Sequence, residues 1–434
     1  MRRTLACGIA GALLTAPAVA GAQYYAPDPP PADVPWYQLV ELGAFVDGYA
    51  GLNYNFPRPH ADANRLRAYD QNTGLALSWV GVDAVFRPDP VGGTLSLRYG
   101  PSADRLADRC LHEDRDANPC DGDVGLEMVQ QAFGSFRPGG SVGVVRLDFG
   151  KFDAGYGLEV AEGYRNTTYT RGLLYSLATP VFFSGVRANV RPLPDMELSF
   201  VIASGQNSTL DNNFGKTLSV QLALKPTPSF TAKVGWVAGP EQDDSTRVTC
   251  PAGQTPLGES GSCAPASNDP PGATYGVGQS GVNHFDAFRH HGDLVLVYRV
   301  SSHLTLAWNG ILGLEGVKEP GVSGTSSALW YGGALSVDVP LSSTWSIGAR
   351  GEYLADEEGR LTGIDDAKLT SATLTFDARL AENLLLRLDN RADVLLSAEG
   401  SKDVFPVGVV DRAGPEDARP YQLTTTLGVI AHTN

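Results

Sequence analysis

The sequence SATLTFDARLAENLLLRLDNRADV, residues 371–394, is the clearest indication of the fold of this chain. In both halves of the stretch apolar residues alternate with polar or charged ones, and Ala381-Glu382-Asn383 separates the halves. A period of two is typical of a β-strand, whose side chains point alternately to the two faces of a sheet. Burying the charged face in a dry core would be costly for every unpaired ion. The sheet therefore needs an apolar solvent on one side and water on the other, which an outer-membrane β-barrel provides.

The same alternation recurs along the chain until a few residues before its end. Tight turns and longer polar loops join the segments in strict alternation, as in bacterial barrels. We expect an all-β protein, a transmembrane antiparallel β-barrel of about sixteen strands over residues 38–434, with short periplasmic turns and long extracellular loops. The expected strands cover residues 38–55, 75–86, 94–99, 127–136, 142–152, 181–191, 196–204, 217–225, 230–238, 293–300, 304–314, 329–339, 345–354, 370–380, 384–395 and 421–431.

The N-terminus has the features of an export signal. Arg2 and Arg3 precede an apolar run, and small residues up to Ala22 offer cleavage sites, so we expect a signal peptide over residues 1–22. The Pro-rich residues 23–37 are expected to form a periplasmic segment before the barrel. No other stretch approaches the roughly 18 apolar residues of a transmembrane helix, which argues against a helical inner-membrane protein.

Charge and cysteine content limit the partners and the compartment. The 434 residues carry a formal net charge of −15, and loss of Arg2 and Arg3 with the signal would make it −17. So acidic a chain is a poor binder of nucleic acid, whereas outer-membrane lipid and lipopolysaccharide are the partners expected of a barrel. Four of the five cysteines fall in two predicted loops. Local pairing in an oxidising compartment predicts the disulfides Cys110–Cys120 and Cys250–Cys263, the most economical of three connectivities.

A barrel of this size leaves a water-filled lumen, and one loop is suited to narrow it. Residues 153–180 form the third long loop and combine charges with tyrosines, so a fold into the lumen would set selectivity there. The candidate constriction residues are Tyr156, Glu159, Glu162, Arg165, Tyr169 and Arg171. The candidate residues of the lumen wall are Arg146, Asp148, Arg187, Arg191, Arg350, Asp377, Arg379, Arg387, Asp389, Arg391 and Asp393. The alternative is an ordinary external loop, with the wall arginines paired to the neighbouring aspartates.

Several stretches resemble a known family when read in order. They include FVDGYAGLNYNFPRP (residues 45–59), LDFGKFDAGYGLEV (147–160), RNTTYTRGLLY (165–175) and LLLRLDNRADV (384–394). Together they resemble the OmpL-like β-barrel porins over nearly the whole chain after the signal. The resemblance implies a channel of the bacterial outer membrane. One departure is the C-terminal Ile-Ala-His-Thr-Asn, where barrels of this kind commonly end in an aromatic residue.

We expect an outer-membrane porin that passes small hydrophilic solutes or ions by passive diffusion, and not an enzyme. The GxGxxG match at residues 276–281 lies in a loop without a strand–helix context, so no cofactor is expected. His290 and His291 point to opposite faces of a strand, which disfavours a shared metal site. The alternatives are a surface adhesin or receptor that uses the disulfide-tied loops, and a barrel enzyme with a site on its rim. The sequence leaves open whether the barrel is a monomer or a homotrimer.

Overall fold

The computed structural model describes residues 39–433 except for residues 58–62, 88, 108–125, 127, 212, 243–244, 250–253, 257–262, 266–273, 279–280, 319–323 and 409–416. The expected signal peptide and Pro-rich segment lie outside the described residues. So do Cys110, Cys120 and Cys250, and with them both expected disulfides.

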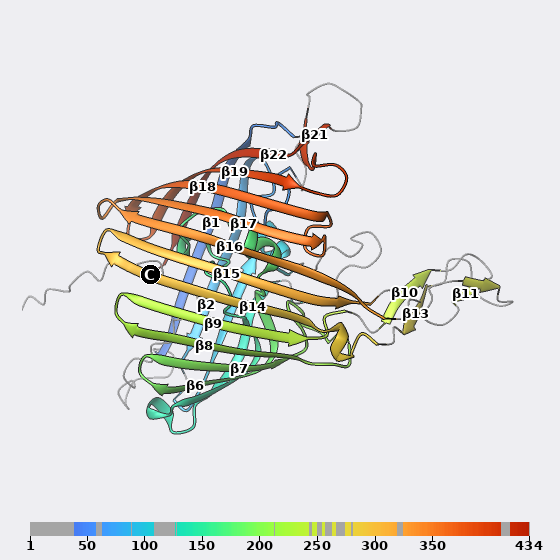
Figure 1. Cartoon of the computed structure of the whole chain (residues 1–434). Coiled ribbons are helices and arrows are strands. Elements are labelled where there is room, and N and C mark those ends of the chain that lie inside the picture. Colours follow the sequence, from blue (N-terminus) through green and yellow to red (C-terminus); the bar gives the residue numbers. More distant parts are fainter. Residues whose placement is uncertain are drawn as a thin grey trace, which may run out of the picture.

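Sixteen strands form a closed antiparallel barrel, in which each strand pairs with its neighbours in the chain and β22 pairs with β1 (Figure 1). They are β1 (Val40–Asn53), β2 (Gly74–Phe86), β3 (Val91–Tyr99), β4 (Val129–Phe136), β5 (Val145–Asp153), β6 (Phe182–Leu193), β7 (Met196–Ala203), β8 (Thr217–Thr227), β9 (Phe230–Gly239), β14 (Arg289–Ser301), β15 (Leu304–Val317), β16 (Ser326–Pro340), β17 (Trp345–Glu358), β18 (Asp365–Ala381), β19 (Leu384–Ser397) and β22 (Tyr421–His432). The predicted fold class and strand number are confirmed.

The remaining elements lie in the connections. Three small hairpins pair only within themselves: β10 (Ser245–Thr249) with β13 (Thr274–Gly278), β11 (Gln254–Pro256) with β12 (Cys263–Pro265), and β20 (Phe405–Val407) with β21 (Asp417–Arg419). A short helix, α1 (Pro101–Ala107), follows β3. No helix in the described part of the chain is long and apolar enough to cross a membrane.

The two ends of the barrel differ. Mostly tight turns lie at one end, here called the short-turn end, and the longest connections lie at the other, the long-loop end (Figure 1). The strand order places the start of β1 and the end of β22 at the short-turn end. In bacterial barrels the short turns face the periplasm, and we orient the molecule accordingly.

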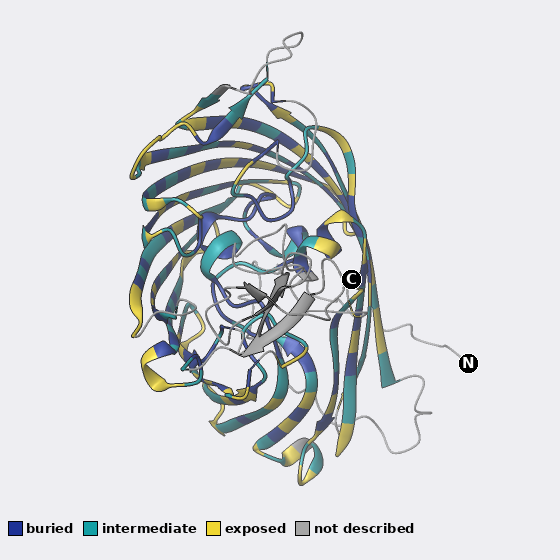
Figure 2. Ribbon diagram, turned by 90° about the vertical axis from the view of Figure 1, so that its right-hand side faces the viewer, coloured by how far each residue is buried: buried dark blue, intermediate teal, exposed yellow. Residues whose placement is uncertain are grey.

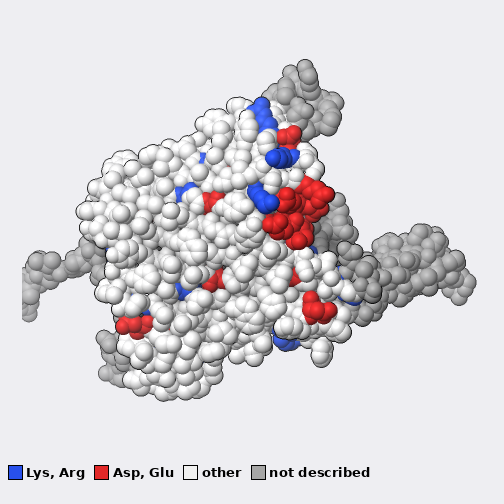
Figure 3. Space-filling model, in the orientation of Figure 1, with Lys and Arg blue, Asp and Glu red and all other residues white. Residues whose placement is uncertain are grey.

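Burial alternates along most of the barrel strands, as Figure 2 shows when the barrel is viewed from its long-loop end. In β19 the side chains of Arg387, Asp389 and Arg391 are buried inside, while Leu388 and Asn390 between them face outward. The outward residues include Leu75, which is 90% exposed, and Phe149, which is 73% exposed. Such an apolar surface is unfavourable in water and favourable in hydrocarbon. Figure 3 shows few charged side chains over the strands, with acidic ones gathered near the long-loop end.

Strand boundaries differ from the expected ones mainly at the long-loop end. β14 starts at Arg289, β16 at Ser326 and β18 at Asp365, each several residues before the expected start. Beyond the membrane both faces of a strand meet polar surroundings, so the alternation that reveals a strand in the sequence is lost there. At the other end β5 starts at Val145, because Gly140–Val142 form a turn of 3-10 helix.

Candidate functional site inside the barrel

Figure 2 shows that part of the chain lies inside the ring of strands, and contacts with β8, β14 and β17 place the connection between β5 and β6 there. This inserted segment, residues 154–181, contains a 3-10 turn (Gly163–Arg165) and a π-helical turn (Leu174–Ala178). It corresponds to the predicted constriction loop. Its contacts reach inward-facing side chains on strands all around the barrel, so it is a structural part of the interior and not an external loop.

The first anchor of the inserted segment is on β8, β9 and β14. The Tyr156 hydroxyl lies 2.8 Å from the Ser219 hydroxyl, and the backbone N–H of Gly157 donates to Asp293 at 3.2 Å. The ammonium of Lys233 donates to the carbonyl of Gly157 at 3.0 Å. These bonds satisfy backbone groups that leave the sheet at the end of β5 and would otherwise be buried without partners.

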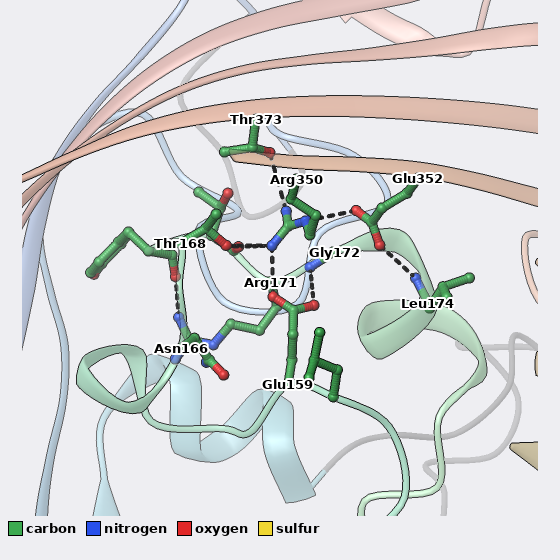
Figure 4. Close-up of polar contacts among 12 residues, drawn as sticks. Glu159, Asn166, Thr168, Arg171, Gly172, Leu174, Arg350, Glu352 and Thr373 are labelled. Carbon is green, nitrogen blue, oxygen red and sulfur yellow. Dashed lines mark hydrogen bonds and ion pairs between the residues drawn. The ribbon is translucent and has the colours of Figure 1, made fainter. Parts of the chain in front are cut away.

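A buried ion-pair network forms the second anchor (Figure 4). The Arg350 guanidinium on β17 contacts Glu159 of the inserted segment at 2.6 Å and Glu352 at 2.9 Å. The other oxygen of Glu159 accepts the backbone N–H of Gly172 at 2.7 Å. Burial and the neighbouring Glu352 raise the pKa of Glu159, although Arg350 opposes this shift. Glu159 therefore touches the wall arginine directly and does not face it across an opening.

Glu162 is the second acid of the inserted segment, and its partner is on β3. Arg98 donates to Glu162 at 2.8 Å and to Asp83 of β2 at 2.9 Å, and Arg165 lies 3.6 Å from Glu162. Burial alone would raise the pKa of Glu162, but the charges of Arg98 and Arg165 outweigh it and lower the pKa to about 2. Glu162 is therefore held as a carboxylate.

A third set of contacts ties the inserted segment to β1, β19 and β22. The Tyr169 hydroxyl donates to Asp47 at 2.8 Å, and the backbone N–H of Thr170 donates to Asp389 at 2.8 Å. A Cβ at Gly428 would lie 2.2 Å from the Tyr169 ring, so only glycine leaves room for the ring there. The predicted residues Tyr169 and Asp389 thus meet in one buried region through the adjacent Thr170.

Most of the predicted wall residues form ion pairs along the sheet. These are Arg387–Asp377 at 2.6 Å, Arg391–Asp393 at 2.7 Å, Arg187–Asp148 at 2.9 Å, Arg146–Asp148 at 3.1 Å and Arg191–Glu197 at 2.6 Å. Several of them also serve the inserted segment: Arg387 donates to the carbonyl of Gly163, and Arg391 to that of Arg171. Arg379 differs from the rest because it is exposed near the short-turn end of β18.

Sequence reasoning did not single out several charged residues that complete this interior. Arg98 and Lys233 occupy inward positions of expected strands, so the alternation itself carried a signal for them. Arg67, in the connection between β1 and β2, lies 2.7 Å from Asp393 and is buried. No local pattern indicates Arg67, because its partner is more than three hundred residues away.

The two adjacent histidines of β14 point to opposite faces, as the sequence predicted. His290 stacks on Trp236 with ring centroids 5.8 Å apart, whereas His291 packs against Tyr156 at 5.9 Å. Among the described residues, no group of three or more His, Cys, Asp or Glu side chains is arranged to hold a metal ion.

The comparison with family models is decisive for this barrel. The family described as "Putative beta-barrel porin-2, OmpL-like" matches residues 39–432, which is nearly the entire described chain. The chain belongs to the OmpL-like porin family. The family resemblance read from the sequence is thereby confirmed, as is the location in the bacterial outer membrane. No curated protein sequence matches this OmpL-like porin.

Solved structures support the fold of this OmpL-like porin. The outer-membrane channel DcaP of Acinetobacter baumannii is similar with a TM-score of 0.52 at 10% identity, over 91% of this chain and 97% of that one. OmpT of Vibrio cholerae is similar with a TM-score of 0.50 at 10% identity and the same coverages. A trimer form of OmpT is also similar, with a TM-score of 0.50 at 10% identity, over 91% of this chain and 99% of that one.

Proposed function

We propose that this OmpL-like porin passes small hydrophilic solutes or ions by passive diffusion along a water-filled path that the inserted segment narrows. The 2.6 Å contact between Glu159 and the buried Arg350 carries this proposal, because it fixes the segment to the barrel wall. A segment bonded to several strands would stay in the lumen and define its narrowest part.

The charges of the inserted segment and of the wall act in this proposal as an electrostatic filter. Because Glu159 already neutralises part of the charge of Arg350, its removal would leave the guanidinium with Glu352 alone. Substitution of Glu159 or Glu162 by Gln should therefore shift the ion preference toward anions. The expected readout is the reversal potential in a salt gradient across a planar bilayer.

The first test is conduction by the purified full chain. Discrete current steps that grow with salt concentration are expected from an open lumen, and a folded but silent barrel would contradict the proposed function. The exposed Glu382, in the turn between β18 and β19, provides the matched control. Glu382→Gln removes the same charge outside the interior and should leave the reversal potential unchanged. A Glu159→Gln channel with wild-type selectivity would show that this charge of the inserted segment does not contribute to ion selectivity.

We also propose that the barrel assembles as a homotrimer. The OmpT neighbour is described in a trimer form, and the apolar outer belt offers surface for contacts between copies as well as for lipid. The mass of the detergent-solubilised protein, measured by light scattering with the detergent contribution subtracted, distinguishes one copy from three. A mass of one chain would contradict the trimer without affecting the channel proposal.

A further inference from the structure

Four arginines occupy neighbouring inward positions on the wall: one directly follows β4, one is near the start of β5, one is in the middle of β6 and one is near the end of β6. We call Arg137, Arg146, Arg187 and Arg191 the arginine cluster. In the register of β5 and β6, Arg146 lies opposite Asn189, two residues from Arg191. In the register of β4 and β5, the residue before Arg137 lies opposite the residue after Arg146. The sheet therefore brings guanidiniums from three adjacent strands to one patch of the inner wall.

Among the described side chains, the patch holds more positive than negative charge. Asp148 accepts from Arg146 and from Arg187, at 3.1 and 2.9 Å, and Glu197 accepts from Arg191 at 2.6 Å. The charge of Asp89, in the turn between β2 and β3, also acts on Arg137. Three acidic side chains therefore face the four arginines of the cluster.

Around the inserted segment, by contrast, two arginines each contact two carboxylates. There, Arg350 lies between two carboxylates, Glu159 and Glu352, and Arg98 likewise lies between Glu162 and Asp83. The chain as a whole has a net charge of −15. A basic patch on the inner wall of so acidic a protein is a local exception.

Arg137 is the member of the cluster least satisfied by the protein. Its Nε is buried and donates no hydrogen bond. Burial and the nearby charges of Arg146 and Arg191 lower the pKa of Arg137, which Asp148 and Asp89 only partly offset. Asp148 cannot take more donors readily, because it already accepts from Ser135 and Asn189 as well as from two arginines. The acidic side chains therefore do not fully balance the positive charge around Arg137.

We propose that the arginine cluster binds small oxyanions, phosphates or carboxylates, at the short-turn end of the lumen. A guanidinium presents paired N–H donors that match the oxygens of these groups, and several on one wall raise the local anion concentration. The role of this site in permeation rests on the proposed function, whereas the binding itself does not require conduction.

Binding is tested on the purified full chain in detergent by isothermal titration with inorganic phosphate and, separately, with succinate. Arg137→Gln is expected to weaken phosphate binding about tenfold, the loss of one charge-assisted donor pair, and Arg137→Lys less. The control is Arg87→Gln, because Arg87 lies at the same end of the barrel but pairs with Glu41 at 2.7 Å outside the cluster. Equal affinity in all variants, or no binding by the wild type, would overturn the proposal. The two titrants decide which oxyanion the site prefers.

Conduction provides the second readout. Arg137→Gln and Arg191→Gln should lower the ratio of anion to cation permeability, whereas Arg87→Gln should change it less. A conducting channel with unchanged permeability in both cluster variants would contradict the role in permeation. A silent channel that still binds phosphate through Arg137 would contradict the proposed function and leave the oxyanion site standing. Retention of the heat-modifiable band on gels confirms that each variant is folded.

Discussion

Single guanidinium groups hold the interior together, and Arg350 does so for two carboxylates at once. Arg350→Ala would leave Glu159 and Glu352 buried without their cation, a cost of about 3–5 kcal/mol. Arg350→Lys keeps the charge but loses the planar set of guanidinium N–H donors, so a smaller loss of stability is expected. The midpoint of urea unfolding, followed by tryptophan fluorescence, measures the difference. Arg379→Ala is the control because Arg379 is exposed, and equal midpoints for the two alanine variants would contradict the assigned role of Arg350.

The lowered pKa of Glu162 predicts how the stability of the fold depends on pH. Its pKa in the folded protein is lowered from 4.5 to about 2, so its carboxylate stabilises the fold at pH values above 4.5. This contribution should be lost as the pH falls from about 4.5 toward 2, by roughly 3 kcal/mol for a shift of this size.

The comparison that isolates this effect is between the wild type and Glu162→Gln, which cannot titrate at this position. Urea unfolding midpoints measured at several pH values between 6 and about 2 provide the data. The difference between the two proteins should shrink on acidification. A constant difference over this range would show that Glu162 is not held as a carboxylate by Arg98 and Arg165.

Among the elements, the inserted segment should be removable without loss of the barrel. Most of its wall partners also have a partner on the sheet: Arg350 has Glu352, Arg98 has Asp83, and Arg387 has Asp377. Replacing residues 159–173 by a short Gly-Ser linker should leave a folded barrel whose single-channel conductance is several-fold larger, since a narrow section is lost. Unchanged conductance would show that the narrowest section lies elsewhere.

Strands and loops of this barrel differ in how far they could be predicted from the sequence. The sixteen barrel strands were predictable because water and hydrocarbon impose opposite demands on successive residues. The loop at residues 153–180 stood out by its charges, and its partners Arg350 and Asp389 stood out by their inward positions, but the individual pairings did not. Glu162 meets Arg98 and Thr170 meets Asp389, contacts between residues far apart in the chain that no local pattern encodes. The small hairpins and α1 were missed because they lie outside the membrane, where neither face is forced to be apolar.

For the whole molecule, closure between the first and last strands decides whether a barrel exists. β22 pairs with both β19 and β1, and the N–H of Thr433 bonds to the carbonyl of Ala44. Deleting residues 421–434 would expose the edges of β1 and β19 to lipid, where unpaired backbone groups are too costly to persist. The truncated chain should therefore lose the heat-modifiable band on gels. By contrast, replacing residues 245–278 by a linker should preserve the band, because β10 and β13 pair only with each other. A folded barrel without β22, or an unfolded one without the hairpins, would show that closure alone does not determine assembly.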